Sequence, residues 1–163
     1  LGFEDIGELA TQEANCTDVN VTEDVRKLFG IDIPFTQSKY IYSYNVIVKA
    51  GYDFGEIRYE VKKDSIKVKL PEVRILSSQV DEDSFRVYHE KESIFNQIRL
   101  EENNAAFAKL KEQAEKDAVA NGLYENARSN AKTILKGYFA QAYDLDDYKI
   151  TFEGGEGGNT NEK

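Results

Sequence analysis

His89 is the only histidine of this 163-residue chain. A catalytic histidine usually works between a nucleophile and an orienting carboxylate. The residues of those types that lie near it in sequence are Ser84, Glu90, Glu92 and Ser93. None of them belongs to a nucleophile elbow or a comparable motif. The sequence therefore favours His89 as an exposed or edge-strand residue and not as a catalytic base.

Cys16 is the only cysteine, so the chain can form neither an internal disulfide nor a Cys-rich zinc site. A cysteine becomes a nucleophile when a base and an electropositive setting lower its pKa. Cys16 is flanked by Asn15, Thr17 and Asp18, and the carboxylate of Asp18 raises the pKa of a neighbouring thiol. We interpret Cys16 as a small packing residue.

The densest group of carboxylates outside the predicted helices consists of Asp144, Asp146 and Asp147. A calcium loop of the EF-hand type needs Gly at its sixth position and Glu at its twelfth. Counted from Asp144, those positions hold Lys149 and Gly155, so the motif fails and the segment is predicted to be a solvated acidic loop. Residues 81–83, Asp-Glu-Asp, are interpreted in the same way. We assign no catalytic, cofactor-binding or metal-binding residue.

A hydrolase remains an alternative, because paired carboxylates for hydrolysis are defined by their distance in space and not in sequence.

Six tyrosines offer a different chemistry in the β-rich part of the chain: Tyr40, Tyr42, Tyr44, Tyr52, Tyr59 and Tyr88. Tyrosine suits binding interfaces, since it buries a large ring while its hydroxyl stays available. Packing beneath helices is the alternative, and the alternation with Ser43 and Asn45 favours it.

The charge balance excludes some partners. The chain has 21 Lys and Arg against 30 Asp and Glu, a formal charge of −9. Nucleic-acid binding needs clustered basic residues, so we expect no nucleic-acid partner. Docking onto anionic lipid through a basic patch is disfavoured for the same reason. The one concentration of positive charge is Lys62, Lys63, Lys67 and Lys69, the only part we would expect near anionic headgroups.

Strands must position most of these residues. Residues 40–50 alternate between apolar and polar, which predicts a strand with one buried face, and the segment 51–55 with its two glycines is predicted to end it. Residues 57–61 and 66–70 predict a β-hairpin whose outer face carries ion pairs across the strands. Short strands are expected at 73–76 and 85–88, separated by an acidic turn at 81–83. A further strand is favoured at 9–21.

Two helices are predicted near the C-terminus. The first starts at Asn103 or Asn104 and stops at Asn121-Gly122, because glycine reaches the left-handed conformation at low cost. The second follows at once, with an apolar stripe of Leu123, Ala127, Ala131, Ile134, Leu135, Tyr138 and Ala142. A short helix is expected within 21–30, ended by Gly30, with 31–34 extended, and a last strand is expected at 148–152.

These elements predict an α+β fold, in which a mostly antiparallel sheet packs against a C-terminal helical pair. Residues 1–153 are predicted to form a single domain. Residues 154–163 are Gly-rich, polar and acidic, and are predicted to form a flexible tail. No run approaches the eighteen or so apolar residues of a membrane helix.

Four local patterns occur together in this order: residues 27–36 (KLFGIDIPFT), 48–53 (VKAGYD), 69–71 (KLP) followed by Ile75-Leu76, and the helical block 121–131. With them the chain resembles the bacterial family known as domain of unknown function 4230, over roughly residues 8–153. Two details depart from the family pattern: an aromatic expected near Asn15-Cys16 is missing, and Asn45-Val46 replaces a frequent Asp-Gly pair.

The resemblance implies a soluble domain that follows an N-terminal hydrophobic anchor, with no established activity and no cofactor. We therefore expect an anchor upstream of Leu1, absent from this chain, that holds the domain at the cell membrane on the extracytoplasmic side. The expected function is non-catalytic binding or scaffolding of a protein or cell-envelope partner. The alternatives are the hydrolase above and a self-assembling membrane scaffold broadly like the stomatin class, and the oligomeric state stays open.

Overall fold

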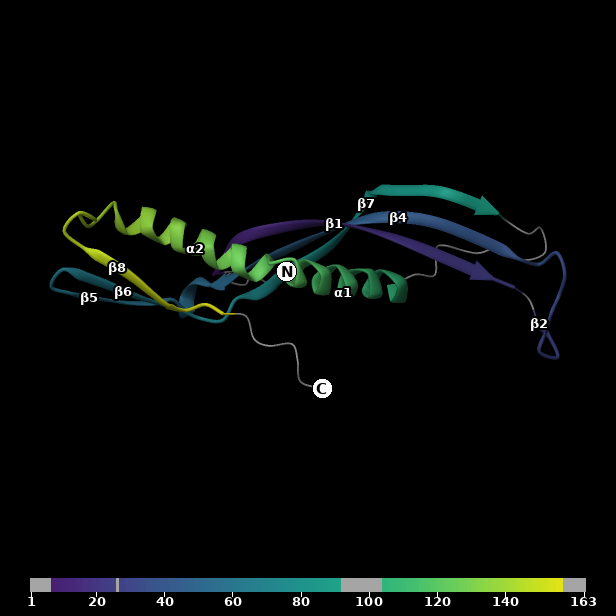
Figure 1. Ribbon diagram of the computed structural model, residues 1–163, viewed down its shortest axis with the longest axis horizontal. Helices are drawn as coiled ribbons and strands as arrows, with labels where there is room; N and C mark the ends of the chain where they lie inside the picture. The colour runs from purple at the N-terminus through teal and green to yellow at the C-terminus, as the bar shows by residue number, and fades with distance from the viewer. Residues whose placement is uncertain (1–6, 26, 92–103, 157–163) are drawn as a thin grey trace, which may run out of the picture. The chain divides into compact units, whose positions relative to one another are not determined.

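The computed structural model describes residues 7–25, 27–91 and 104–156, and it shows an α+β protein with mostly antiparallel strands and two helices near the C-terminus, as predicted (Figure 1). The elements are β1 (Glu8–Asp24), β2 (Lys27–Leu28), β3 (Ile31–Asp32), β4 (Ser38–Asp53), a short 3-10 helix (Phe54–Glu56), β5 (Arg58–Lys62), β6 (Ser65–Leu70), β7 (Arg74–Lys91), α1 (Asn104–Ala120), α2 (Leu123–Phe139) and β8 (Lys149–Gly154). Their strands form three sheets, in the orders β1-β4-β7, β2-β3 and β5-β6-β8.

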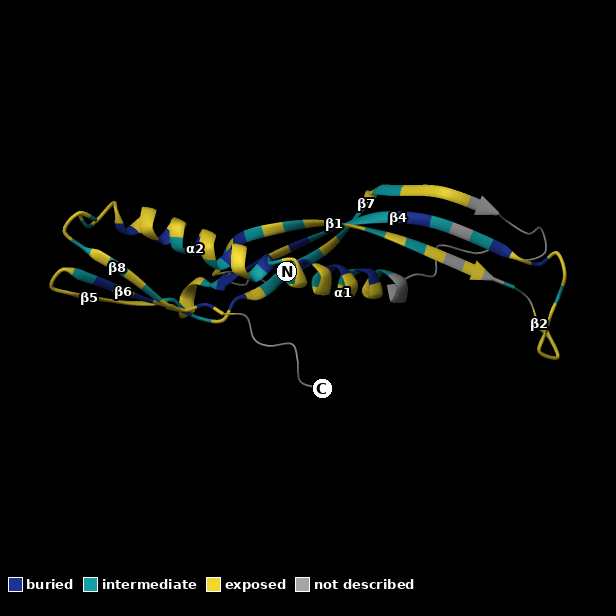
Figure 2. Ribbon diagram, viewed as in Figure 1, coloured by how far each residue is buried: buried dark blue, intermediate teal, exposed yellow. Residues whose placement is uncertain are grey.

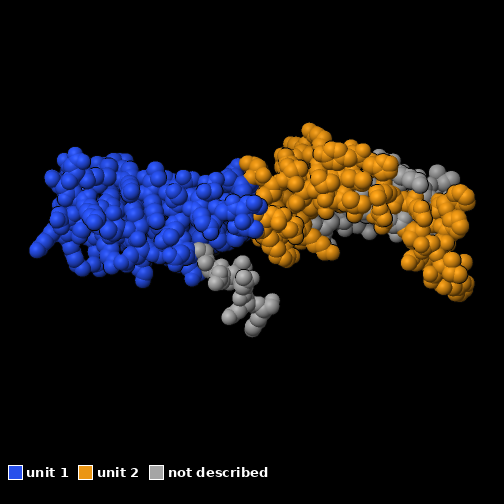
Figure 3. All heavy atoms as spheres, viewed as in Figure 1, with its two compact units in different colours: residues 1–14, 48–78, 118–163 blue, residues 15–47, 79–117 orange. Residues whose placement is uncertain are grey.

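The chain divides into two compact units (Figure 3). Unit 1 comprises Leu1–Ala14, Val48–Ser78 and Ala118–Lys163, and unit 2 comprises Asn15–Ile47 and Gln79–Asp117. The long strands β1, β4 and β7 each contribute residues to both units. No helix within the described part of the chain is long and apolar enough to cross a membrane.

Unit 1 is built around β6 and α2. The predicted hairpin is confirmed: β5 pairs antiparallel with β6, and β8 joins β6 on its other side in parallel. Alternation along β6 buries Ile66, Val68 and Leu70. Helix α2 starts after Gly122, which has a left-handed φ of 88° as the sequence predicts, and it buries a residue at every fourth position: Leu123, Ala127, Ala131, Leu135 and Phe139.

The buried face of α2 differs from the predicted stripe at its C-terminal end. Ile134 and Tyr138 are 46% and 60% exposed, whereas Phe139, absent from the prediction, is buried. The ring of Phe139 lies against Tyr59 of β5, with 5.1 Å between the centroids. A strict spacing of four residues turns slowly around a helix, so the buried side passes to Phe139.

Hydrogen bonds hold α2 against the start of β1. The Thr11 hydroxyl donates to the Ala127 carbonyl oxygen at 2.9 Å, and the Asn130 amide donates to the Thr11 carbonyl oxygen at 2.9 Å. Each of these side chains bonds to a backbone carbonyl of the other element. Together they fix the position of the helix along the strand.

The C-terminal Gly-rich segment enters the core of unit 1. Strand β8 ends at Gly154, and the hydroxyl of the fully buried Tyr52 donates to the Gly155 carbonyl oxygen at 3.0 Å. Arg128 pairs with Glu156 at 3.4 Å. Packing therefore continues to Glu156 in the segment predicted as a tail, and residues 157–163 lie outside the described ranges.

Unit 2 combines parts of β1, β4 and β7 with α1. The rings of Tyr44 and Phe85 stack with centroids 4.8 Å apart, and Phe107 of α1 meets Tyr44 edge-on at 5.4 Å. Leu110 and Ala114 bury the adjoining face of α1. Figure 2 shows how buried and exposed positions alternate along the strands.

Three predictions about elements are wrong. No helix forms within 21–30: β1 continues to Asp24, and β2 and β3 form a small hairpin around Phe29-Gly30. No turn forms at 81–83, since β7 runs unbroken through these residues and the Asp83 N–H donates to the Asp81 side chain at 3.2 Å. Strand β4 is not broken at Gly51 but continues to Asp53, whose carboxylate caps the short 3-10 helix that follows.

Candidate functional site

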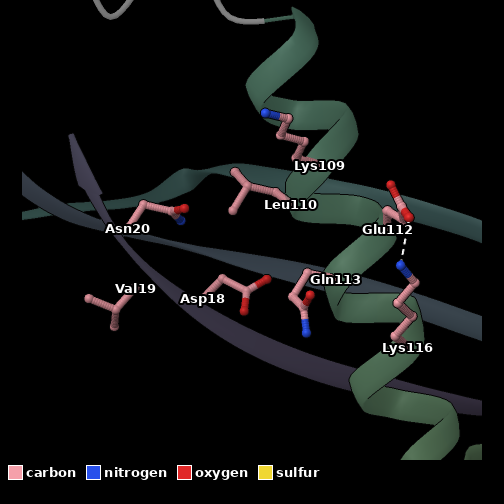
Figure 4. A pocket seen from close by; sticks show the side chains of 8 residues that line it. All are labelled: Asp18, Val19, Asn20, Lys109, Leu110, Glu112, Gln113 and Lys116. Atoms are coloured by element: carbon pink, nitrogen blue, oxygen red, sulfur yellow. Dashed lines mark hydrogen bonds and ion pairs between the residues drawn. The ribbon is translucent and has the colours of Figure 1, made fainter. Parts of the chain in front are cut away.

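A pocket of about 350 Å³ lies between β1 and α1 in unit 2 (Figure 4). Its lining consists of Asp18, Val19, Asn20, Lys109, Leu110, Glu112, Gln113 and Lys116. Alternate residues of β1, namely Cys16, Asp18 and Asn20, are half-buried beside the helix, while those between them are exposed. The strand period of two thus places a polar row of β1 against α1.

Two polar atoms of this row are buried and have no hydrogen-bond partner within the described part of the chain: Oδ2 of Asp18 and Nδ2 of Asn20. The pKa of the Asp18 carboxyl is raised, chiefly because burial disfavours its charge and further because Asp117 lies nearby. An acceptor beside a donor can bind a small polar group that offers the complementary pair.

The opposite wall of the pocket carries an ion pair along α1. Lys116 Nζ lies 2.6 Å from Glu112 Oε1, one helical turn away (Figure 4). The hydrogen bond from Lys116, reinforced by its charge, lowers the pKa of Glu112. The pocket therefore holds two carboxyl groups whose pKa values are shifted in opposite directions.

Cys16 lies beside this pocket without the properties of a nucleophile. Its thiol donates to the Ala114 carbonyl oxygen at 3.6 Å. Burial raises the pKa of the thiol, and Asp18 and Asp117 raise it further. The predicted effect of Asp18 on the pKa of Cys16 is thereby confirmed, and a thiol with a raised pKa is a weak nucleophile at neutral pH.

The structure does not bring His89 together with a nucleophile among the described residues. His89 lies exposed on β7, an edge strand, as predicted. The Ser84 hydroxyl instead accepts a hydrogen bond from the Asn45 N–H at 2.7 Å and is thus used within the sheet. Ser93 and Glu92 lie outside the described residues.

The predicted acidic loop is a solvated turn. The Asp144 side chain accepts from the Asp146 N–H at 3.0 Å, and all three aspartates of the loop are exposed. Over the described ranges, no group of three or more His, Cys, Asp or Glu residues could hold a metal ion.

The tyrosines of the β-rich part differ in burial. Tyr42 and Tyr52 are buried, whereas Tyr59 and Tyr88 are 56% and 64% exposed.

On the β5–β6 hairpin, Lys67 pairs at 2.8 Å with Glu153 of β8, and Lys62 pairs at 2.7 Å with Glu60 of its own strand. The sequence predicted ion pairs between the two hairpin strands; the pairs found here lie instead within β5 and between β6 and β8. Both pairs partly neutralise the positive charge of the hairpin.

The feature that sequence reasoning missed is a set of exposed apolar side chains around the β2–β3 hairpin, here named the apolar tip: Leu28, Phe29, Ile31 and Phe35. Phe29 is 97% exposed and Phe35 88%, with Ile31 at 74% and Leu28 at 59%. The prediction of a short helix within 21–30 concealed the tip, because it placed Leu28 and Phe29 in a helix and not at an exposed hairpin turn.

Two tight turns display the phenylalanines. Phe29 and Gly30 form the hairpin turn with φ values of 51° and 82°. In the second turn the Thr36 N–H donates to the Ile33 carbonyl oxygen at 3.4 Å, and Phe35 has a φ of 65°. On the two sides of the first turn, β2 and β3 pair in register, and Lys27 lies 3.6 Å from Asp32.

Comparison with known proteins identifies the family alone. No curated protein and no solved structure matches the chain. A family model described as "Protein of unknown function (DUF4230)" matches residues 2–150, nearly all of the chain. The patterns 27–36, 48–53 and 121–131 that carry the resemblance lie within this range, and the chain belongs to the DUF4230 family of proteins of unknown function.

Proposed function

We propose that this domain is a non-catalytic interaction module that works beside a bacterial membrane and makes its contact through the apolar tip of unit 2. The observation that carries the proposal is the exposure of Phe29 and Phe35, at 97% and 88%. Single exposed apolar residues are ordinary on protein surfaces. Here four large ones fall within eight positions, with Leu28 opposite Ile31 in the hairpin, and concentrations of exposed apolar side chains mark interaction sites.

The energy available from the tip is sufficient for an interaction. Transferring one Phe, Leu or Ile side chain from water to an apolar environment is favourable by about 1.5–3 kcal/mol. Several such side chains acting together give weak to moderate affinity after the cost of association is subtracted. The tip thus suits a module whose local concentration at its target is already high, as an anchor upstream of Leu1 would provide.

Membrane attachment and an extracytoplasmic position belong to the proposal. They are supported by the organisation that the family resemblance implies, an N-terminal hydrophobic segment before this domain. The charge of −9 fits a domain whose surface is repelled by anionic headgroups and whose contact is apolar.

Sedimentation with isolated membranes of the source bacterium tests the proposal. The purified chain should co-sediment with them, and the double variant Phe29→Asn/Phe35→Asn should stay in the supernatant. Phe54→Asn is the matched control, because Phe54 is 51% exposed on the 3-10 helix of unit 1. Equal sedimentation of the double variant and the chain, or no sedimentation of the chain, would contradict the proposal.

One observation favours hydrolysis of a small polar substrate as a second function. Asp18 and Glu112 line the same pocket, and their pKa values are shifted up and down. A carboxylic acid and a carboxylate that line one pocket can serve as general acid and general base. Turnover of chromogenic ester, phosphoester or glycoside substrates, abolished in Asp18→Asn, would establish it. Turnover that survives in Asp18→Asn and Glu112→Gln would eliminate it.

A further inference from the structure

We propose that the target of the apolar tip is a lipid bilayer, into whose interfacial layer Phe29 and Phe35 insert. This inference rests on the proposed function, because it names the partner of the same surface. Four observations in unit 2 carry it: backbone strain, exposure, area and charge.

The backbone strain falls on the two most exposed residues. A hairpin turn with positive φ at both central positions favours Asn-Gly, and here the first position is Phe29. A turn with Pro at its second position and positive φ at its third favours Gly or Asn there, and here the third position is Phe35. Positive φ is an outlier for a bulky side chain. Each phenylalanine therefore occupies a strained position where Gly or Asn would suit the turn better, so the fold alone does not account for the exposed rings.

The exposure of Phe29 points to a fluid partner. The Phe29 ring is 97% exposed, so solvent surrounds nearly all of it, and the hairpin is coloured as exposed throughout in Figure 2. A protein partner would need a pocket that encloses the turn. Lipid chains and headgroups rearrange around an inserted ring and need no preformed pocket.

The area of the tip is small for a protein interface. One phenylalanine buries about 150–250 Å². A standard protein–protein interface requires about 800 Å² from each partner. Phe29 and Phe35 together thus provide about half of that area, and Leu28 and Ile31, which are 59% and 74% exposed, add smaller areas, so the tip alone at most approaches what a stable dimer needs. Interfacial insertion has no such threshold, since its strength grows with each buried ring.

The charge of the tip is balanced. Residues 27–36 contain one lysine and one aspartate, and these two are the pair Lys27–Asp32. Without net charge, the segment has no electrostatic attraction to anionic headgroups. Binding should therefore occur on zwitterionic lipid and depend little on salt.

Tryptophan fluorescence tests the insertion directly, because the chain has no native Trp. Phe29→Trp gives a single reporter at the tip. On addition of phosphatidylcholine vesicles its emission should shift to the blue, and lipids brominated along the acyl chain should quench it. Phe54→Trp in unit 1 is the control, and its emission should stay unchanged.

Phe29→Asn separates binding from folding. Because Asn suits this turn, the variant should unfold at the same or a higher temperature than the chain. Its partition into phosphatidylcholine vesicles should fall by roughly 10- to 100-fold, the loss expected for one inserted Phe. A variant with a lowered unfolding temperature is replaced by Phe35→Asn, which should lose vesicle binding in the same way.

The outcomes distinguish this inference from the proposed function. An unshifted Phe29→Trp emission with vesicles, together with tip-dependent sedimentation with native membranes, would overturn the lipid inference and leave a membrane protein as the partner. Failure of both would overturn both proposals. A Phe29-dependent dimer in sedimentation analysis without lipid would overturn the lipid inference in favour of a second copy.

Discussion

Gly51 shows how closely two backbones approach in unit 1. A Cβ atom at this position would lie 2.0 Å from the Leu9 carbonyl oxygen and 2.9 Å from Cα of Ala10. Both atoms belong to the backbone of β1, which cannot move aside as a flexible side chain could. Glycine is required at position 51 because the two strands nearly touch and not because the chain turns there.

Gly51→Ala is therefore expected to lower the free energy of unfolding by more than about 2 kcal/mol, the range of severe steric lesions. Gly137→Ala is the matched control, since nothing lies within 4 Å of a Cβ at this exposed position in α2. That substitution should raise the free energy of unfolding by about 0.5–1 kcal/mol through helix propensity. Urea denaturation measures both, and similar values for the two variants would contradict the close approach.

Tyr52 is expected to make stability depend on alkaline pH. Burial raises its pKa from 10.0 to about 12, and the nearby Arg128 opposes this in part. Between pH 10 and 12 the unfolded chain loses the phenolic proton while the folded chain keeps it, so the stability due to Tyr52 is complete below pH 10 and falls as the pH rises to 12.

Comparison with Tyr52→Phe isolates this effect from other groups that titrate in the same range. Near pH 8 the variant should be less stable by about 0.5–1.5 kcal/mol, because the hydrogen bond to Gly155 is lost. The difference should shrink between pH 10 and 12. A constant difference across that range, measured by urea denaturation, would contradict the assignment.

At the scale of elements, α2 packs tightly through small residues. Ala127 and Ala131 are fully buried, and Thr11 bonds to the backbone of the helix beside them. Ala131→Leu should lower the free energy of unfolding by about 1–3 kcal/mol through overpacking. Ser129→Leu adds the same side chain on the exposed face of α2 and should change stability by less than about 0.5 kcal/mol. Equal effects in thermal unfolding would show that the helix lies farther from its neighbours.

The spacing of apolar residues and the position of Gly122 predict the regular elements well. Alternation identified β4 through Val46 and Val48, and the spacing of Leu123, Ala127 and Ala131 identified α2. Gly122 marked the boundary between the helices, because a φ of 88° is cheap only for glycine. The α+β class follows from these elements together.

The wrong predictions share one physical cause. Each rested on the local sequence, whereas the structure depends on contacts with residues far away in the chain. Asp81 and Asp83 suggest a turn by composition, but pairing with β4 keeps β7 extended. Leu28 and Phe29 suggest a helical face, whereas the structure exposes both. The pocket joins Asp18 to Glu112 over more than ninety positions, and neither belongs to a motif, so the sequence carries no signal for it.

At the scale of the whole chain, the net charge of −9 should modulate the binding that the apolar tip provides. At low ionic strength the chain should bind anionic phosphatidylglycerol vesicles more weakly than neutral phosphatidylcholine vesicles, since like charges repel. Screening should bring the two affinities together near 0.5 M salt. Vesicle titration of Phe29→Trp measures both, and tighter binding to anionic vesicles at low salt would show that basic residues dominate.

Neither compact unit is a continuous stretch of sequence. Unit 1 takes three segments of the chain and unit 2 takes two, and the segments alternate. No continuous stretch of sequence therefore contains one whole unit without part of the other: the shortest stretch that holds all of unit 2, residues 15–117, includes residues 48–78 of unit 1. Recombination that transfers continuous segments therefore cannot move one unit alone into another protein. We expect the two units to be inherited together, which the lengths of the family's members would test.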